Sequence, residues 1–293
     1  MKSIIVIIDY FGSRPEWFPI FLESCRWNPT IKWRINSNCL HNDSGVPNVE
    51  ICQMTREEYI DQVKRTLNIN FAPSDDYKLC DLRPAYGVLH YEAIRNYDFY
   101  GYGDLDVIYG NIRKFYTDQV LDYNVISTHS WCISGHFALI RNQDWLRNAF
   151  RNIPGWETIL EDGANRRFDE DTFRHVFQNP PDTIHDWKKV YCVEQFTTPL
   201  TPSPWLNGKS FHPDVWYWKD GRIYNNMDGD REFIYLHFMN FRNARYMHPR
   251  YGDRAYWADI EKLVHVRPED ISKGVVIDRS GFRLLERSRD NSG

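Results

Sequence analysis

The stretch Phe99-Tyr-Gly-Tyr-Gly-Asp-Leu-Asp-Val-Ile-Tyr-Gly110 gives the strongest indication of how this chain folds. Its aromatic and aliphatic residues predict a buried strand over residues 97–102. Two acids, Asp104 and Asp106, stand where that strand ends. Ligands bind at the carboxyl ends of the strands in open α/β sheets, so the two acids lie where such a fold would place a ligand site.

The two carboxylates suit a divalent cation. Residues spaced i and i+2 point to opposite faces of a strand, but where the strand turns into a loop both can converge on one ion. Hard oxygen ligands favour Mg²⁺ or Mn²⁺, and such an ion would neutralise a diphosphate leaving group. Asp pairs are also common in turns, which is the alternative explanation. The apolar strand before the acids, with Gly101 and Gly103 leaving room for a close ligand, favours the metal site.

The segments around this stretch alternate between strand and helix patterns, which predicts an α/β sheet. Residues 4–8 form a β-branched run typical of a strand buried on both faces, and Thr55-Arg-Glu-Glu58 has the arrangement of a capping box. Residues 180–231, rich in Pro, Gly, Trp and Asn, predict loops and short hairpins. The predicted strands are residues 4–8, 31–35, 49–54, 97–102, 124–128, 136–140 and 233–237. The predicted helices are residues 16–26, 55–67, 84–94, 144–150 and 172–177.

The composition limits the class of protein. With 293 residues, of which 42% are hydrophobic, the chain can bury a substantial core in one large domain, with or without an extension. The formal net charge of −4 gives no polyanion-binding signal, so we expect no nucleic-acid partner. The aromatic content of 16% suits stacking on sugars or bases, but an aromatic core is the preferred explanation.

Cysteine spacing and hydropathy indicate the compartment. The six cysteines are scattered without a CxxC pair or zinc-ligand spacing, which predicts free thiols in a reducing cytoplasm. The apolar N-terminal run stops at Asp9, short of a signal-peptide core, and no later segment is long enough to span a bilayer. We therefore expect a cytoplasmic protein, at most peripheral to the inner face of the membrane. Basic residues near the C-terminus offer a contact to anionic lipid, although a solvated or frayed tail is the preferred explanation; they are Arg279, Arg283, Arg287 and Arg289.

Further candidate site residues follow later in the chain. Asp169, Glu170 and Asp171 precede a predicted helix, where acids either cap the helix or act in catalysis. His237 ends a predicted apolar strand. A structural core histidine is the commoner case, but a neutral imidazole also suits a third ligand for a metal held by an Asp-x-Asp pair. Arg242, close behind, is a fitting partner for phosphate oxygens.

The loop before residue 84 carries a third group of charges. Lys78, Asp81 and Arg83 stand just ahead of the predicted helix that leads to the Asp-x-Asp strand. A nucleotide site needs an acceptor for base N–H or ribose hydroxyl groups and cations for phosphate, which these residues could supply. A charged, solvated loop with a helix cap is the alternative.

The order of these elements resembles that of the GT-A glycosyltransferases, which use nucleotide sugars: strand, helix, strand, Asp-x-Asp, a later acidic motif, and a strand ending in His. Up to about residue 250 the chain also resembles an uncharacterised bacterial family encoded in capsule and O-antigen gene clusters. The segments that carry the resemblance are Tyr10-Phe-Gly12, Pro15-Glu-Trp-Phe-Pro19, Leu22-Glu-Ser-Cys25, Asn28-Pro29, Tyr77-Lys-Leu-Cys-Asp81, Pro84-Ala-Tyr-Gly87, Gly103-Asp-Leu-Asp-Val-Ile-Tyr-Gly110, Gly135-His-Phe137, Arg141-Asn142, Phe168-Asp-Glu170 and His237-Phe238.

The resemblance implies a domain organisation and a set of site residues. It implies a GT-A domain over residues 1–250, made of a nucleotide-sugar half (1–110) and an acceptor and metal half (111–250), with a C-terminal extension over 251–293. Mn²⁺ or Mg²⁺ would be held by Asp104, Asp106 and His237. The donor-binding candidates are Asp9, Tyr10, Phe11, Gly12, Lys78, Asp81 and Arg242.

Three positions depart from the patterns that the resemblance implies. Asp9 stands where the bacterial family usually has Pro, and Asn36-Ser-Asn38 stands where its second strand tends to end in Asp. Arg242 takes the place of the Lys of a Gly-x-x-Lys-Pro-Trp segment, which is missing. Asp9 and Asn36-Ser-Asn38 imply a different preference for base or donor sugar, whereas the missing segment bears on the closing of a loop over the diphosphate.

The activity implied is transfer of a sugar from a nucleotide sugar, with a UDP-galactose type of donor suggested by analogy. The acceptor would be a hydroxyl of a bacterial surface polysaccharide or lipid-linked glycan. In an inverting enzyme one of Asp169, Glu170 and Asp171 would be the general base, and in a retaining enzyme these acids would position donor and acceptor. The glycogenin-like order of motifs slightly favours retention.

Two alternatives stay open. Asp-Leu-Asp-Val-Ile also resembles the signature of HAD-type phosphatases, whose first Asp is a nucleophile. Those enzymes carry it on their opening strand, however, whereas here it follows a whole strand-helix-strand unit. The other alternative is a GT-A-like scaffold without catalytic activity that binds a glycan or a partner enzyme.

Overall fold

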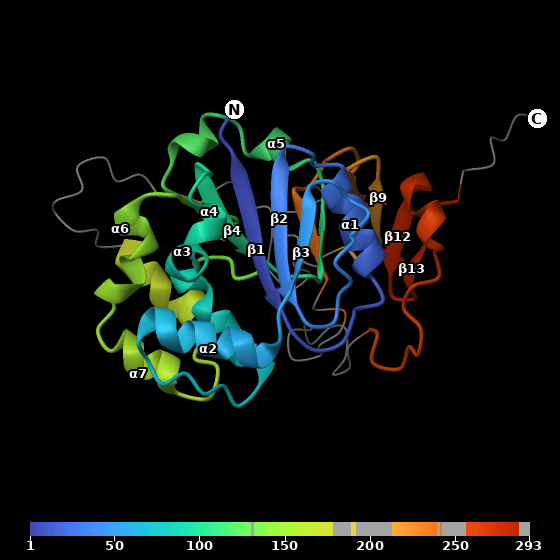
Figure 1. The fold of residues 1–293 in the computed structure, drawn as a ribbon. Coiled ribbons are helices and arrows are strands. Elements are labelled where there is room, and N and C mark those ends of the chain that lie inside the picture. Colours follow the sequence, from blue (N-terminus) through green and yellow to red (C-terminus); the bar gives the residue numbers. More distant parts are fainter. Residues whose placement is uncertain (130–131, 178–188, 192–212, 239–240, 242–255, 287–293) are drawn as a thin grey trace, which may run out of the picture. The chain divides into compact units, whose positions relative to one another are not determined.

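The computed structural model describes residues 1–129, 132–177, 189–191, 213–238, 241 and 256–286 (Figure 1). Within this part of the chain, no helix is both long enough and apolar enough to cross a bilayer. The chain divides into two compact units, which we describe separately. The first comprises Met1–Arg14, Pro29–Leu105 and Arg113–Gln195, and the second Pro15–Asn28, Asp106–Ile112 and Phe196–Gly293.

The first unit is built on a mainly parallel sheet. Strands β1, β2, β3 and β4 are parallel, β7 runs antiparallel to both β4 and β6, and β8 is parallel to β6. Figure 1 shows β1, β2 and β3 side by side. These observations confirm the predicted α/β class with a mixed, mainly parallel sheet. The order across the sheet is β3 (Val49–Gln53), β2 (Ile31–Ser37), β1 (Ile4–Tyr10), β4 (Phe99–Gly103), β7 (Phe137–Arg141), β6 (Val125–Ser127) and β8 (Lys189–Tyr191).

Helices and helical turns flank this sheet. The longest, α2 (Arg56–Leu67), begins with the predicted capping box, in which Thr55 and Glu58 bond to each other's backbone N–H groups. Its buried side chains join a hydrophobic core with Ile5 and Ile7 of β1. The other helices and helical turns between β3 and β8 are η1 (Asp76–Ala85), α3 (Tyr86–Leu89), α4 (Tyr91–Ile94), α5 (Ile112–Phe115), η2 (Val120–Asp122), α6 (Asp144–Arg147), η3 (Ala149–Asn152), α7 (Trp156–Glu161), η4 (Phe168–Thr172) and η5 (Phe173–Phe177).

Three predicted helices differ from those observed. The helix predicted over residues 84–94, with Pro84 in its first turn, is instead a 3₁₀ segment ending at Ala85 followed by two short helices. The break falls at His90, whose backbone leaves the helical region (φ −113°, ψ 24°) while its side chain bonds to buried Asp9. Residues 144–150 form one α-helical turn and a 3₁₀ turn. The helix predicted over residues 172–177 is a 3₁₀ turn over Phe173–Phe177, preceded by a π-helical turn over Phe168–Thr172, so the acids 169–171 lie inside a helical turn and not ahead of a helix.

The second unit has an aromatic core. Trp216 and Trp218 of β9 are fully buried. They belong to one hydrophobic cluster with Phe282 of β13, with Trp17 just before α1 and with Ile20 of α1. This burial confirms the aromatic-core interpretation for these residues. One antiparallel sheet has the order β10 (Arg222–Asn225), β9 (Trp216–Lys219), β12 (Val275–Asp278) and β13 (Gly281–Leu284). A smaller sheet pairs β5 (Val107–Tyr109) with β11 (Tyr235–His237), and the helical elements are α1 (Phe18–Arg26) and η8 (Pro268–Lys273).

Arg279 and Arg283 lie in and beside an antiparallel hairpin and not in a frayed tail, and both side chains are about half exposed to solvent. Strands β12 and β13 form a hairpin in which Arg283 pairs with Asp278. Arg279 lies over the ring of Tyr256, with its guanidinium carbon 4.2 Å from the ring centre. Arg287 and Arg289 lie outside the described residues.

The cysteine prediction holds for the described residues. Cys25, Cys39, Cys52, Cys80 and Cys132 are free thiols, and Cys192 lies outside the described part. Burial raises the pKa of the Cys25 thiol well above its ordinary value, so this side chain acts as an apolar core residue.

Candidate metal and donor site

The Asp-x-Asp motif forms the turn between β4 and β5. The Asp104 backbone N–H donates to the carbonyl of His136 at 3.2 Å, and the buried Leu105 side chain anchors the middle of the turn. The Phe238 N–H donates to the carbonyl of Asp106 at 3.2 Å. Because β11 pairs with β5 in the register His237 to Val107, the histidine lies beside Asp106.

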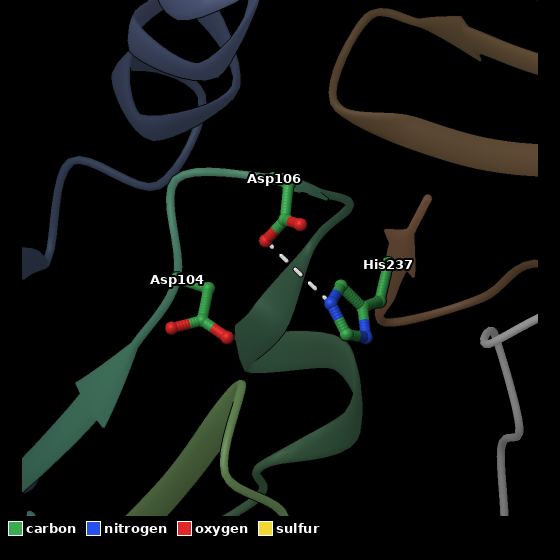
Figure 2. Close-up of side chains that lie close together, drawn as sticks. All are labelled: Asp104, Asp106 and His237. Atoms are coloured by element: carbon green, nitrogen blue, oxygen red, sulfur yellow. Dashed lines mark ion pairs between the residues drawn. The ribbon is translucent and has the colours of Figure 1, made fainter. Parts of the chain in front are cut away.

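This turn and its partner strand gather three metal-ligating groups. The Nε2 atom of His237 is 3.5 Å from a carboxylate oxygen of Asp106 (Figure 2). With Asp104, two residues earlier in the same turn, these side chains offer one ligand atom each, all within 4.8 Å of one another. Two carboxylates and an imidazole fit Mn²⁺ or Mg²⁺ with room for water or phosphate oxygens. The side chain of His237 is 4% exposed and that of Asp104 is 28% exposed. The histidine of the cluster is therefore buried, whereas Asp104 is open to solvent.

Asp104 is also connected to the acidic motif through Arg83. The Arg83 guanidinium donates through Nη2 to Asp104 and through Nη1 to Asp169 at 2.8 Å. Burial raises the pKa of Asp169 to about 7, because its effect and that of neighbouring Glu170 outweigh the lowering by Arg83. A carboxyl group with such a pKa exchanges a proton near neutral pH.

The three acids of the acidic motif have different environments. Asp169 is buried, whereas Glu170 and Asp171 are partly exposed and pair with Arg167 at 3.1 and 2.8 Å. Gly135 packs against the buried side of this motif, since an added Cβ would lie 2.9 Å from Asp169 Oδ2 and 3.0 Å from Glu170 Oε1. Asp169 is therefore the acid of this motif that Arg83 links to Asp104.

The structure places Lys78 and Asp81 in the interior. Both side chains have 0% exposure, and they form an ion pair of 2.9 Å. Lys78 also donates to the carbonyl of Ile159 at 2.7 Å, and Asp81 accepts from the backbone N–H groups of Arg166 at 2.7 Å and Phe168 at 2.8 Å. In this conformation the pair anchors the segment that leads into the acidic motif.

The loop after β1 lies at the same sheet edge as the Asp-x-Asp turn, because β1 and β4 are adjacent parallel strands. Tyr10 donates its hydroxyl to the carbonyl of Ser13 at 2.9 Å, and the ring of Phe11 is buried. Gly12 has φ +133°, which favours glycine, and an added Cβ there would meet no atom within 4 Å. The glycine is therefore required by the backbone conformation of this loop, and its N–H donates to Asn38 Oδ1 at 3.1 Å.

Asp9 occupies a different place from the rest of that loop. Its carboxylate is fully buried, accepting from Asn36 Nδ2 at 2.6 Å and bonding to His90 Nε2 at 2.9 Å. It lies under the loop, which it supports. Arg242, the remaining candidate for the donor, lies outside the described residues.

The sequence interpretation gave Arg83 no place in the metal site. It treated this residue as one of several charges in a nucleotide loop, whereas the structure shows that it joins Asp104 to Asp169. No spacing in the sequence indicates contacts between segments so far apart. Gly135 was noted only as part of a motif.

Comparison with solved structures finds weak likenesses. The galactosyltransferase LgtC, solved with donor and acceptor sugar analogs, is 14% identical, with a TM-score of 0.35 over 59% of this chain and 69% of that one. Mouse xyloside xylosyltransferase 1 is 9% identical, with a TM-score of 0.32 over 54% of this chain and 72% of that one. The glycosyltransferase GlyE of Streptococcus pneumoniae TIGR4 is 12% identical, with a TM-score of 0.30 over 56% of this chain and 44% of that one. TM-scores this low carry no conclusion about fold or activity.

Comparison with protein families gives a clearer result. No curated protein matches this chain with significance. A family model described as a family of unknown function (DUF6625) matches residues 6–266. Because that match covers most of the sequence, the chain belongs to the family of unknown function DUF6625.

Proposed function

We propose that the chain is a metal-dependent glycosyltransferase that moves a sugar from a nucleoside-diphosphate sugar to a hydroxyl group of a glycan. The observation that carries the proposal is the cluster of Asp104, Asp106 and His237 at the carboxyl end of β4. Two carboxylates and an imidazole at the edge of a mainly parallel sheet suit a cation that binds a diphosphate.

The sheet order supports a nucleotide next to this cluster. From β1 the chain continues to β2 and β3 on one side, while β4 lies on the other side of β1. The carboxyl ends of β1 and β4 therefore flank a topological switch point, where open α/β sheets bind ligands. The backbone of Tyr10, Phe11 and Gly12 follows β1 at this point and is the proposed contact for the nucleotide.

The residues present divide the chemistry between them. Asp104, Asp106 and His237 would hold Mn²⁺ or Mg²⁺, which when bound supplies positive charge to a departing diphosphate. Asp169, with its pKa of about 7, is the acid best placed to exchange a proton near this cluster, and Glu170 lies next to it. In an inverting reaction Asp169 would accept the proton of the acceptor hydroxyl, and in a retaining reaction it would orient the acceptor. The order of motifs slightly favours retention.

The finer assignments rest on the sequence resemblance alone. We propose a UDP-hexose donor of the galactose type and an acceptor that is a bacterial surface polysaccharide or lipid-linked glycan. The catalytic domain is proposed to span residues 1–250, acting in the cytoplasm or at the inner face of the membrane. The C-terminal extension (251–293) is the proposed part for a membrane contact.

A donor turnover assay tests the proposal. The purified chain is incubated with a panel of UDP-, GDP- and CDP-hexoses with Mn²⁺, and release of nucleoside diphosphate is measured. We expect one class of donor to be turned over, EDTA to abolish turnover, and Asp106→Ala to lower it by about a hundredfold or more. A matched control is Asp61→Asn, an exposed acid on α2.

Three results would argue against the proposal. Metal-dependent turnover that persists in Asp106→Ala would remove the metal assignment. Hydrolysis of p-nitrophenyl phosphate without donor turnover would favour a phosphatase. Binding of neither donor nor nucleoside diphosphate would favour a non-catalytic scaffold.

A further inference from the structure

The Arg83 guanidinium is held in one position by three groups of the first unit. Its two terminal nitrogens donate to different carboxylates, those of Asp104 and Asp169. Its central carbon lies 5.9 Å from the ring centre of Tyr102, a residue of the strand that leads to Asp104. The Arg83 side chain is 10% exposed, and its partners Asp169 and Asp104 are 4% and 28% exposed, so the pair with Asp169 is the better shielded from solvent.

Gly135 provides the room for this arrangement. An added Cβ at Gly135 would stand 2.8 Å from Arg83 Nη1, closer than real Cβ atoms approach. The same Cβ would be 2.9 Å from the Asp169 oxygen that accepts from Arg83. A side chain at position 135 would therefore require the ends of the Arg83 and Asp169 side chains to shift from these positions.

In this geometry Arg83 would compete with a bound cation for the negative charge of Asp104. One carboxylate oxygen of Asp104 accepts from the guanidinium, and the same side chain belongs to the cation cluster with Asp106 and His237. A cation bound there would lie close to a fixed positive charge, which lowers its affinity. A diphosphate brought by the donor would add negative charge and offset this repulsion.

We propose that Arg83 is a positioning residue that makes binding of the cation and of the nucleoside diphosphate cooperative. This inference rests on the proposed function. Arg83 keeps Asp104 and Asp169 in one arrangement and weakens cation binding until the diphosphate is present. By linkage, the cation strengthens nucleotide binding by the same factor.

The test is a Mn²⁺ titration by calorimetry, with and without UDP, of the wild-type chain, Arg83→Gln and Arg83→Lys. Wild type is expected to bind Mn²⁺ at least about tenfold more tightly with UDP. Arg83→Gln should bind Mn²⁺ about tenfold more tightly than wild type without UDP and lose most of the cooperativity. Its kcat should fall, because Asp104 and Asp169 are no longer held together.

Arg83→Lys separates charge from geometry. Lysine keeps the positive charge but cannot form the planar fork that bridges two carboxylates. We expect it to keep the weak Mn²⁺ affinity of wild type without UDP while its kcat falls. If Arg83→Gln fails to fold because Asp169 is left buried without its cation, Arg83→Gln/Asp169→Asn removes both charges, and the same tighter Mn²⁺ binding is expected.

The outcomes are distinguishable. Folded Arg83→Gln, or the double variant, with Mn²⁺ affinity and cooperativity equal to those of wild type would overturn the role of Arg83. A wild-type chain that binds Mn²⁺ neither with nor without UDP would overturn the proposed function itself.

Discussion

At the scale of single residues, Asp9 shows how a buried charge supports the loop after β1. Its carboxylate is enclosed by Asn36, in register on the neighbouring strand, and by His90 from the break between two short helices. Burial raises the pKa of Asp9, but the charge and hydrogen bonds of these partners lower it by more, so it lies below its ordinary value of 3.8. The charged form is therefore favoured by the fold.

The expected consequence is a pH-dependent contribution to stability. Because the folded-state pKa is depressed, the ionised carboxylate stabilises the protein above pH 3.8, and this contribution is lost as the pH falls through the folded-state pKa. Asp9→Asn should lower the free energy of unfolding by about 3 kcal/mol at pH 7. The difference from wild type should shrink below pH 3.8.

Urea unfolding at pH 7 and at about pH 3 measures this difference, on either side of the ordinary carboxyl range. The control is Asp61→Asn on the exposed face of α2, which should leave stability almost unchanged at pH 7. An equal loss of stability at both pH values in Asp9→Asn would show that the charge of Asp9 contributes nothing.

Asp9 and Asn36 show what could be predicted from sequence at the scale of single residues. Asp9 and Asn36 were noted separately as departures from the pattern of the resembling family, and the structure shows that they bond to each other at 2.6 Å. Lys78 and Asp81 were predicted as donor-binding residues, with a solvated loop as the alternative, but the structure buries both side chains in an ion pair. Residue type indicates what a side chain can bond to, whereas its partner depends on the fold.

At the scale of elements, β4 is constrained by its antiparallel neighbour β7. The sequence interpretation attributed Gly101 to a close ligand. The structure shows instead that an added Cβ would meet the backbone oxygen of Ala138 and, at 2.6 Å, the side chain of Leu139. Gly101 therefore permits close contact between β4 and β7.

A substitution at this position should separate β4, which leads into the metal turn, from its neighbour β7. We expect Gly101→Ala to lower the free energy of unfolding by about 3 kcal/mol, since the backbone of β7 cannot yield as a flexible side chain would. Gly229→Ala is the matched control. An added Cβ there meets nothing within 4 Å, so its cost is the strain of φ +58°, about 1 kcal/mol. Equal midpoints for the two variants in chemical denaturation would contradict this role of Gly101.

The segment that leads into the acidic motif is anchored by the buried ion pair between Lys78 and Asp81. Removing one partner of such a pair leaves the other charge uncompensated, so Asp81→Asn should cost about 3–5 kcal/mol in thermal or urea unfolding. Lys78→Met/Asp81→Asn removes both charges and should be more stable than Asp81→Asn alone. A double variant less stable than either single variant would show that the ion pair is not the reason for the loss.

Elements with strong local signals were predicted well, and those set by tertiary contacts were not. The strands β1 to β4 follow from apolar runs of β-branched or aromatic residues, and the capping box of α2 follows from the Thr55 to Glu58 spacing. The helix predicted over residues 84–94 is broken because His90 turns out of the helix toward Asp9, a contact between distant segments. Periodicity carries no information on such a partner.

At the scale of the whole molecule, the candidate site depends on long-range pairing. Asp104 and Asp106 could be placed at a strand end from sequence, since an apolar strand precedes them. His237 could be suggested from its imidazole at a predicted strand end and from the resemblance, but its place beside Asp106 could not, because it results from the pairing of β11 with β5. The link through Arg83 had no sequence signal at all.

Asp104, Asp106 and His237 are proposed to form a cation site that also binds a nucleoside diphosphate. Calorimetric titration of Mn²⁺ in the presence of UDP tests it most directly, with wild type, Asp106→Asn, His237→Ala and the control Asp61→Asn. We predict saturable binding to wild type and to the control, and affinity at least about tenfold weaker in Asp106→Asn and His237→Ala. Folded Asp106→Asn and His237→Ala chains that bind Mn²⁺ as tightly as wild type would contradict the claim.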